Sequence, residues 1–425
     1  MNIKFKLTVL NFLEFAVWGA YLISMGGYLA KVGLGANIGL FYSVQGFVSL
    51  IMPTFMGIVA DRWMQAQRVL SLCHFLAGVF MIGASTYCLQ AGNSVDFATL
   101  FALYTASVAF FMPTIALANS VCYNALDKAG LDSVKAFPPI RVFGTIGFIV
   151  SMWIVDIANW EVKPYQFLWS GALSLFMALY ALNMPKCEVT GSKKGEGLIK
   201  ALGLEAFALF RNYRMALFFI FSMLLGCCLQ ITNGYATPFL QSFGFDEVYQ
   251  DTLAVRYPIV LMSLSQISET LCILLIPFCL SKFGIKKVML MAMLSWTLRF
   301  GFFALGNPGT GVWLLILSMI VYGIAFDFFN ISGSLFVDKE TDISIRNSAQ
   351  GLFMMMTNGL GASLGMIVAG WVMNMYTQNE GGLMISKSDT GGWSMAWTVF
   401  ALYALVVTLV FAIMFKYKHT PDSKK

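Results

Sequence analysis

Long apolar segments follow one another along almost the whole chain, separated by short polar stretches. An apolar segment of about 18–20 residues is long enough to cross a bilayer as a helix. The sequence contains twelve such segments, at about 7–31, 37–60, 69–91, 97–122, 138–158, 165–184, 213–237, 257–280, 287–306, 311–337, 347–376 and 393–416. The pattern therefore predicts an all-α membrane protein with twelve transmembrane helices.

The longest polar interruption, residues 185–212, separates six of these segments from the other six. Its first part is rich in Gly, Ser, Lys and Glu, which is typical of a flexible linker. We therefore expect two six-helix bundles, residues 1–184 and 213–425, joined by a cytoplasmic linker. The basic start of the chain resembles a leader peptide, but no clean cleavage site follows it, so we expect an uncleaved first helix.

Composition supports the membrane assignment and excludes several other classes. The chain is 58% hydrophobic and 11% charged, whereas soluble domains carry about 25% charged residues. The net charge of +6 is no nucleic-acid signal, because the basic residues lie in short loops. The eight cysteines lie mostly in apolar runs without metal-site spacing, and there are only two histidines. We expect no metal, no cofactor and no nucleic-acid partner.

The distribution of basic residues predicts the orientation in the membrane. With both termini in the cytoplasm, all but five of the 27 Lys and Arg residues fall in cytoplasmic loops, inner helix ends or termini. The five exceptions are Lys31, Lys163, Arg256, Arg299 and Lys387. Because cytoplasmic loops carry the excess of Lys and Arg, we expect both termini to be cytoplasmic.

The tenth apolar segment contains a polar face. Its only charge is Asp327, and a carboxylate at this depth costs about 2.5–3.5 kcal/mol on insertion scales. At about 100° per residue, one side of the helix carries Tyr322, Gly323, Phe326, Asp327, Asn330 and Ser334. The other side carries Leu317, Val321, Ile324, Phe328, Ile331 and Leu335. We expect the first side to line a cavity and the second to face lipid or packing partners.

Polar residues also share helix faces in three other segments. Arg141, Thr145 and Phe148 are spaced i, i+4, i+7 in a segment where Pro138 and Pro139 suit a helix start. Two further pairs have i, i+3 spacing: Gln230 with Asn233, and Gln266 with Glu269. Each group also has a structural interpretation. Arg141 could lie at the interface with its side chain snorkelling to phosphate, and the amides could hold helices together. Glu269 could form a buried ion pair with an arginine.

Two more charges interrupt apolar runs. Glu14 lies about a third of the way into the first segment, where it could pair with a basic helix end or take part in transport. Arg299 lies near the outer end of the ninth segment, which favours a snorkelling or structural charge.

This set of residues suits a transporter that exchanges protons. Burial and nearby charges shift the protonation of carboxyl groups, and substrate or alternating access can change that balance. Amides and carboxylates also hold hydroxyl-rich or heterocyclic ligands through directed hydrogen bonds, and the aromatic residues add flat apolar faces. A sugar or a nucleoside fits this description, and residue chemistry alone leaves both open.

Several stretches resemble a known family. Gly57 to Trp63, GIVADRW, is similar to the G-x-x-x-D-R loop of the major facilitator superfamily, and SKFGIKK at 281–287 echoes it without the Asp. Four stretches resemble the bacterial nucleoside:proton symporters of that superfamily: FPPIRVFGTIGF at 137–148, LQITN at 229–233, SQISET at 265–270 and YGIAFDFFNISG at 322–333. The resemblance covers essentially the whole chain.

The resemblance implies proton-driven uptake of nucleosides across the bacterial inner membrane by alternating access. It places substrate contacts at Arg141, Thr145, Phe148, Gln230, Asn233, Gln266, Glu269, Tyr322, Phe326 and Asp327. Asp327 is the first candidate for the transported proton and Glu269 the second, while Asp61 and Arg62 are expected to latch the inner gate. Glu14 departs from the family pattern, which has glutamine there.

Three other functions remain as alternatives. A sugar or drug transporter could use the same fold, since a fold does not fix the substrate. A membrane-embedded enzyme acting on lipid would need a catalytic constellation, and none is apparent, so we expect no enzyme. A sensor would bind nucleosides without moving them. We expect a monomer in the lipid bilayer.

Overall fold

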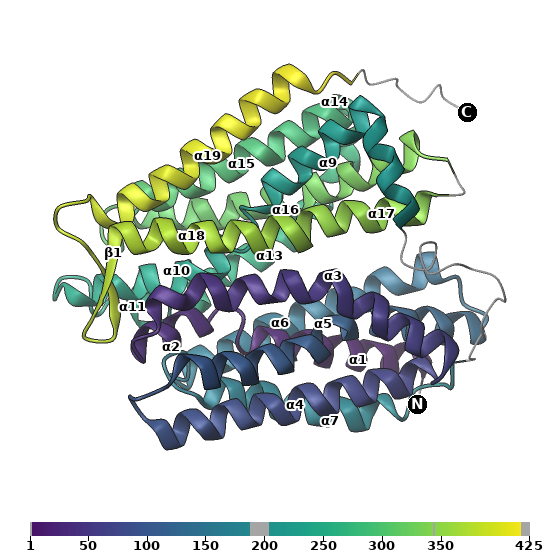
Figure 1. The fold of residues 1–425 in the computed structure, drawn as a ribbon, viewed down its shortest axis with the longest axis horizontal. Helices are drawn as coiled ribbons and strands as arrows, with labels where there is room; N and C mark the ends of the chain where they lie inside the picture. Colours follow the sequence, from purple (N-terminus) through teal and green to yellow (C-terminus); the bar gives the residue numbers. More distant parts are fainter. Residues whose placement is uncertain (1, 188–203, 343–344, 418–425) are drawn as a thin grey trace. The chain divides into compact units, whose positions relative to one another are not determined.

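The computed structural model describes residues 2–187, 204–342 and 345–417. Its first part is helical throughout (Figure 1). The elements are α1 (Ile3–Gly19), α2 (Met25–Lys31), η1 (Gly35–Asn37), α3 (Ile38–Arg62), α4 (Ala66–Ala91), α5 (Phe97–Lys128), α6 (Ser133–Ile157) and α7 (Tyr165–Ala181).

The second part is also helical, apart from one hairpin. It contains η2 (Leu204–Arg211), α9 (Tyr213–Gly226), α10 (Ile231–Ser242), η3 (Phe243–Phe245), α11 (Leu253–Arg256), α12 (Pro258–Met262), α13 (Leu264–Ile273), α14 (Ile276–Phe283), α15 (Ile285–Leu305) and α16 (Val312–Glu340). It continues with α17 (Arg346–Met354), the π-helical turn η4 (Met355–Gly361), α18 (Ala362–Tyr376), the strands β1 (Thr377–Glu380) and β2 (Leu383–Ser386), and α19 (Gly392–Met414).

All twelve predicted segments are helical, although only some are uninterrupted. Within the described ranges, nine helices are long and apolar enough to cross a membrane, and a pair bent by 55°, Pro258–Ile273 with Ile276–Phe283, makes a tenth. The remaining two are the first segment, which is divided into α1 and α2, and α7, which has 17 residues. The fold class of an all-α membrane protein is confirmed.

Two segments are broken by tight turns rather than by proline or charge. Between α1 and α2, Tyr21 N donates to the carbonyl of Trp18 at 3.3 Å, and between α9 and α10, Cys228 N donates to Leu225 at 2.9 Å. These bonds span three residues instead of four, so the helix is locally wound more tightly, as in a 3₁₀-helix. Irregular backbone at membrane depth is tolerated where protein or a cavity satisfies it.

The predicted start of the fifth helix is wrong. Pro138 and Pro139 lie inside α6, which begins at Ser133. The Ser133 hydroxyl donates to Asp127 Oδ1 at 2.7 Å, which ties the start of α6 to the end of α5. Prolines inside transmembrane helices are accepted because neighbouring groups satisfy the freed backbone, so the proline pair marks no boundary here.

The hairpin of β1 and β2 was not expected from the hydrophobic pattern. The two strands pair into a two-stranded sheet. The turn between them holds Gly381 at φ 59° and Gly382 at φ 81°, and a two-residue turn of this kind requires positive φ at both positions. The glycine pair is therefore the sequence signal for this hairpin.

The chain forms two compact units. Unit 1 comprises residues 1–195, 233–238 and 381–383, and unit 2 comprises residues 196–232, 239–380 and 384–425. Much of the predicted linker, residues 188–203, lies outside the described residues, so the proposed boundaries at 184 and 213 stay a prediction.

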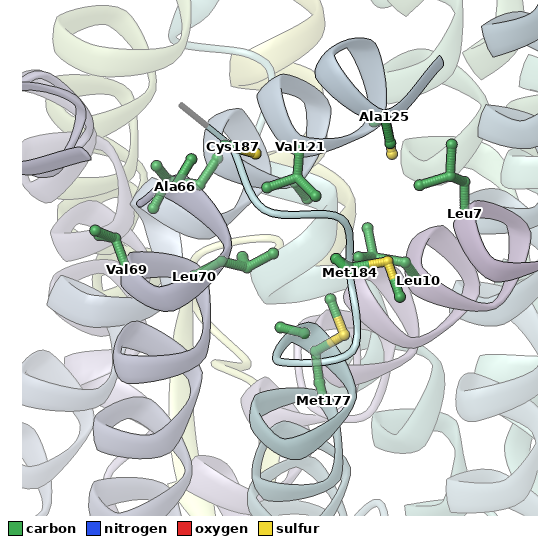
Figure 2. Close-up of a cluster of buried hydrophobic side chains, with 14 of the residues drawn as sticks. Leu7, Leu10, Ala66, Val69, Leu70, Val121, Ala125, Met177, Met184 and Cys187 are labelled. Atoms are coloured by element: carbon green, nitrogen blue, oxygen red, sulfur yellow. The ribbon is translucent and has the colours of Figure 1, made fainter. Parts of the chain in front are cut away.

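Unit 1 contains a compact apolar cluster between α1, α4, α5 and α7 (Figure 2). Its fully buried members include Leu7, Leu10, Leu70, Val121, Ala125 and Met177. Methionine and small residues alternate with leucine in this cluster, which lets the four helices pack closely. The cluster fixes the helices from which the polar side chains of unit 1 project.

Two glycines allow the closest helix contacts relevant to the candidate site. In unit 1, a Cβ on Gly147 of α6 would lie 2.1 Å from the carbonyl oxygen of Phe12 on α1. In unit 2, a Cβ on Gly323 of α16 would lie 2.6 Å from the carbonyl carbon of Ser268 on α13. Only glycine permits backbones to approach this closely.

Candidate functional site

The polar face of α16 is buried within unit 2. Tyr322 and Asp327 are only 6% and 7% exposed, whereas Leu317 and Ile331 on the other side are 42% and 38% exposed. The rings of Tyr322 and Phe326 stack with their centroids 5.8 Å apart. This arrangement agrees with the face predicted for this helix, and it combines an aromatic surface with a carboxyl group.

Arg299 of α15 lies directly against this face. Its side chain is 1% exposed, and its guanidinium carbon lies 4.4 Å from the centre of the Tyr322 ring. Nη1 donates to the Ser318 carbonyl at 2.9 Å and to the Ser265 hydroxyl at 3.3 Å, and Nη2 donates to Thr232 at 3.0 Å. The snorkelling alternative is therefore wrong. Arg299 is a buried residue that joins four helical segments of unit 2 and supports the Tyr322 ring.

The two candidate proton carriers both lie near the same tyrosine. Glu269 of α13 and Asp327 of α16 are both close enough to Tyr322 to interact with it electrostatically, as is Arg299. Glu269 is half-buried, and Gln266, one turn earlier on α13, is 8% exposed. Unit 2 therefore brings two carboxylates, one guanidinium and one phenol into a single cluster.

The packing of α13 on α16 brings this cluster together. Gly323 lies against the backbone of Ser268 and Glu269, and the Ser268 hydroxyl donates to the carbonyl of Ile320. The helix ends on both sides of α13 are turns with bonds that span three residues: Ser263 N donates to the carbonyl of Val260 at 3.2 Å, and Leu275 N donates to that of Cys272 at 3.0 Å. Gln266 and Glu269 thus lie on a short helix piece between two interruptions.

In unit 1, α6 presents the residues predicted for substrate contact. The guanidinium carbon of Arg141 lies 3.8 Å from the centre of the Phe15 ring on α1. Phe148 is 7% exposed and meets the edge of Trp18, with ring centroids 6.1 Å apart. Thr145, which lies between Arg141 and Phe148 in the sequence, is half-buried. An arginine on an aromatic face beside a second aromatic pair suits recognition of a flat ring.

Gln230 and Asn233 lie at a helix break. Gln230 is the N-cap residue of α10 and is half-buried, and Asn233, in unit 1, is 8% exposed. The sequence pattern predicted one continuous helix through both residues, and this prediction is wrong, because the helix is interrupted between Gly226 and Ile231. Broken helices are common at the binding sites of transporters because they free backbone and side-chain groups for a ligand.

Glu14 pairs with a histidine rather than with a basic helix end. Glu14 Oε2 lies 2.8 Å from Nε2 of His74. The Thr114 hydroxyl oxygen lies 2.6 Å from Glu14 Oε1 and 2.6 Å from the Phe111 carbonyl oxygen, and its single proton serves one of these two acceptors at a time. Both members of the pair are buried, at 1% and 0% exposure. Nothing in the spacing of Glu14 and His74, 60 residues apart, indicated this pair.

The two predicted gate residues lie at the end of α3. Arg62 is the last residue of that helix and is exposed. Asp61 precedes it, and its side chain lies outside the part that the structure describes. The latch assigned to Asp61 and Arg62 therefore stays a prediction.

Comparison with known proteins identifies the family. The sequence pattern that defines the family described as "Nucleoside H+ symporter" matches residues 1–420. The chain belongs to the nucleoside:proton symporter family. It is thus a transporter of the nucleoside symport class, as the resemblance of its motifs predicted.

Individual relatives agree with the family. The xanthosine permease of Escherichia coli strain K12 is 48% identical over 429 residues, which cover 100% of this chain and 99% of the relative. The nucleoside permease NupG of the same strain is 47% identical over 422 residues, which cover 99% of this chain and 97% of the relative.

Solved structures support the same fold. A crystal structure of the nucleoside transporter NupG matches with a TM-score of 0.88 at 45% identity, covering 98% of this chain and 100% of that chain. A mutant of the same transporter matches with a TM-score of 0.91. This nucleoside symporter therefore has the major facilitator fold, and it is a multi-pass protein of a bacterial inner membrane.

Proposed function

We propose that this symporter takes up nucleosides together with protons by alternating access, with both termini in the cytoplasm. The observation that carries the proposal is the cluster of Arg299, Tyr322, Glu269 and Asp327 within unit 2. It joins an aromatic surface to two acids, and a nucleoside symporter needs both, one for the base and one for the proton. A functional monomer completes the proposal.

The base and the ribose require different contacts. A nucleobase has a flat face, so Phe148, Tyr322 and Phe326 are the proposed stacking residues. The edge of the base and the ribose hydroxyls require donors and acceptors, which Gln230, Asn233, Gln266 and Glu269 provide. Arg141 and Thr145 complete the proposed set of contacts. Gln230 and Asn233 lie at a helix break and Gln266 and Glu269 on a short helix, where transporters commonly bind substrates, whereas Arg141 and Thr145 lie inside the long helix α6.

Asp327 is the proposed proton carrier. Its side chain is 7% exposed, and keeping an ionised carboxylate at membrane depth costs about 2.5–3.5 kcal/mol on insertion scales. A proton removes that cost, and alternating access changes the surroundings of the side chain, so the proton can be loaded in one state and released in another. Glu269 is the second candidate.

The proposal is tested by uptake into proteoliposomes. Labelled xanthosine, uridine and adenosine are supplied with and without an inward proton gradient, and accumulation is measured. We expect accumulation only with the gradient, and its collapse with an uncoupler. Accumulation of a sugar that competes with the nucleosides would instead support a sugar transporter, and binding without accumulation would support a sensor.

The role of Asp327 is tested by Asp327→Asn. The amide has the same shape and no titratable proton, so we expect nucleoside binding to persist and gradient-driven accumulation to be lost. Asp246→Asn is the matched control, because Asp246 is exposed in a loop and accepts a hydrogen bond from Val248 N at 3.0 Å that asparagine can also accept. Unchanged accumulation by Asp327→Asn would disprove the assignment.

A further inference from the structure

The Glu14–His74 pair belongs to a hydrogen-bonded network that crosses four helices of unit 1. Glu14 lies on α1, His74 on α4, Thr114 on α5 and Ser174 on α7. All four side chains are at most 1% exposed. None of them belongs to the substrate contacts or the proton carriers described above, so the network has no role in the mechanism so far.

The hydrogen bonds of Ser174 fix the position of one imidazole proton. The Ser174 hydroxyl donates to the backbone carbonyl of His74 at 2.9 Å. Its oxygen also lies 3.0 Å from His74 Nδ1. A serine has one hydroxyl proton, so when Ser174 donates it to the carbonyl, Nδ1 carries a proton and donates to Ser174 Oγ. We take this tautomer as the basis of the inference, and the ¹⁵N measurement below tests it.

In this tautomer, a second, mobile proton lies between His74 and Glu14. Nε2 of His74 is 2.8 Å from Glu14 Oε2, and neither a bare imidazole nitrogen nor a carboxylate oxygen can donate. One of the two therefore carries a proton, either as imidazolium with carboxylate or as neutral imidazole with carboxylic acid. Without that proton, the lone pair of His74 Nε2 would face the Glu14 carboxylate, and the negative charge of Glu14 would be left buried.

The pair is linked to the substrate-contact helix. Phe15, the neighbour of Glu14, lies under Arg141 of α6, and Gly147 of α6 packs on the backbone of Phe12. His74 also touches Phe111, which contacts Trp18, and Trp18 meets Phe148. A change in the bond between α1 and α4 is thus transmitted to α6 through direct packing.

We propose that Glu14 and His74 form a second proton-binding site, which is loaded in this conformation and exchanges one proton during each transport cycle. The inference rests on the proposed symport. Loss of the proton to water breaks the bond between α1 and α4, and its return restores that bond. The titratable groups that interact electrostatically with Glu14 are Cys73 on α4 and Cys122 on α5, and the charged Arg141 of α6 covers the ring of the neighbouring Phe15.

The test measures the number of protons moved per nucleoside in proteoliposomes, using a pH indicator and labelled nucleoside together. Glu14→Gln is the informative variant, because an amide can donate to neutral His74 and accept from Thr114 while carrying no mobile proton. We expect Glu14→Gln to accumulate nucleoside with one proton fewer per molecule than the unmodified protein. An unchanged ratio would overturn the proposal, because the pair would then keep its proton throughout.

A matched control separates proton exchange from a packing role. Thr114→Val removes the hydroxyl that bonds Glu14 Oε1 and keeps the mobile proton, so we expect its proton ratio to match that of the unmodified protein. A reduced ratio in Thr114→Val would assign the effect to packing and count against the site. If the unmodified protein moves no protons at all, the proposed symport fails before this inference is reached.

A spectroscopic measurement tests the loaded pair without transport. The chain has two histidines, so ¹⁵N-histidine labelling gives signals from two imidazole rings, each with an Nδ1 and an Nε2, and Glu14→Gln identifies the pair that belongs to His74. We expect Nδ1 of His74 to be protonated in both proteins, and Nε2 to share a proton only when Glu14 is present. An unprotonated Nδ1, or identical Nε2 signals in the two proteins, would refute the shared proton.

Discussion

Replacing Gly323 by alanine tests whether the contact between α13 and α16 positions the acids of unit 2. The added Cβ would lie 2.6 Å from the carbonyl carbon and oxygen of Ser268 and 2.8 Å from Glu269 N. Ordinary contact begins at 3.4 Å, so the two helices must separate by roughly 0.8 Å at this point. All of these neighbours are backbone atoms, which cannot rotate away as a flexible side chain would.

The expected cost follows from this overlap. Forcing an extra methyl group into a packed contact costs about 1–3 kcal/mol. If that cost falls on the conformation that binds nucleoside, affinity decreases about 5- to 150-fold, since about 1.4 kcal/mol corresponds to a factor of ten. The shift also moves Glu269 away from Tyr322 by more than the roughly 0.5 Å within which functional groups must be held.

Nucleoside affinity is measured by calorimetry on the purified protein, uptake in proteoliposomes, and stability by thermal unfolding in detergent. Gly301→Ala is the control, because Gly301 lies inside α15 with no atom within 4 Å of the added Cβ. We expect it to be neutral or to stabilise by up to about 1 kcal/mol through helix propensity. Gly323→Ala with unaltered affinity and uptake would refute this reasoning, as would equal damage by Gly301→Ala.

Two further changes probe residues that were described above or that lie at helix ends. Arg299→Lys should lower the stability of the protein by about 3–5 kcal/mol, as expected for a broken buried charged network, because one ammonium cannot reach both Ser318 and Thr232 while covering Tyr322. Thermal unfolding measures the effect, with Arg214→Lys at an exposed ion pair as the control, and equal melting temperatures for the two variants would contradict this prediction. Asp96, at the start of α5, accepts hydrogen bonds from the backbone and hydroxyl of Thr99, which lower the pKa of its carboxyl group. The stabilisation by this cap is therefore present at neutral pH and is lost as pH falls through that lowered pKa. The difference in melting temperature between Asp96→Ala and the unmodified protein should shrink in acid, and a difference that persists there would contradict the capping role.

The hydrophobic pattern was sufficient to predict the helices but not their interruptions. Apolar runs locate the segments because a bilayer imposes a minimum length. The breaks beside Trp18 and Gln230 leave no mark in the hydropathy of the sequence, because they change backbone hydrogen bonds and not the apolar character of the residues. Pro138 does not mark a helix start, because proline in a membrane helix is less disruptive than proline in a soluble one.

The candidate site was predictable within each helix and not between helices. The faces of α6 and α16 follow from helical spacing alone, and the structure agrees with the buried side of α16. The contacts of Arg299 with Tyr322 and of Glu14 with His74 join different helices, and a single sequence gives the depth of a residue but not its neighbour. Tertiary packing therefore decides the partners of the buried charges.

The π-helical turn at Met355–Gly361 has a consequence for how insertions and deletions are tolerated. A π-turn holds one residue more than the α-helical turn it replaces. Four residues later, Gly365 lies against the backbone of Cys227, where a Cβ would come within 2.4 Å of the Cα atom. Deleting one residue from the turn therefore restores α-helical bonding while α18 keeps its orientation relative to α17, and Gly365 keeps that contact. A one-residue gap aligned at this turn is compatible with the same packing of α18, whereas a one-residue gap within a regular part of the helix would rotate everything after it by about 100°.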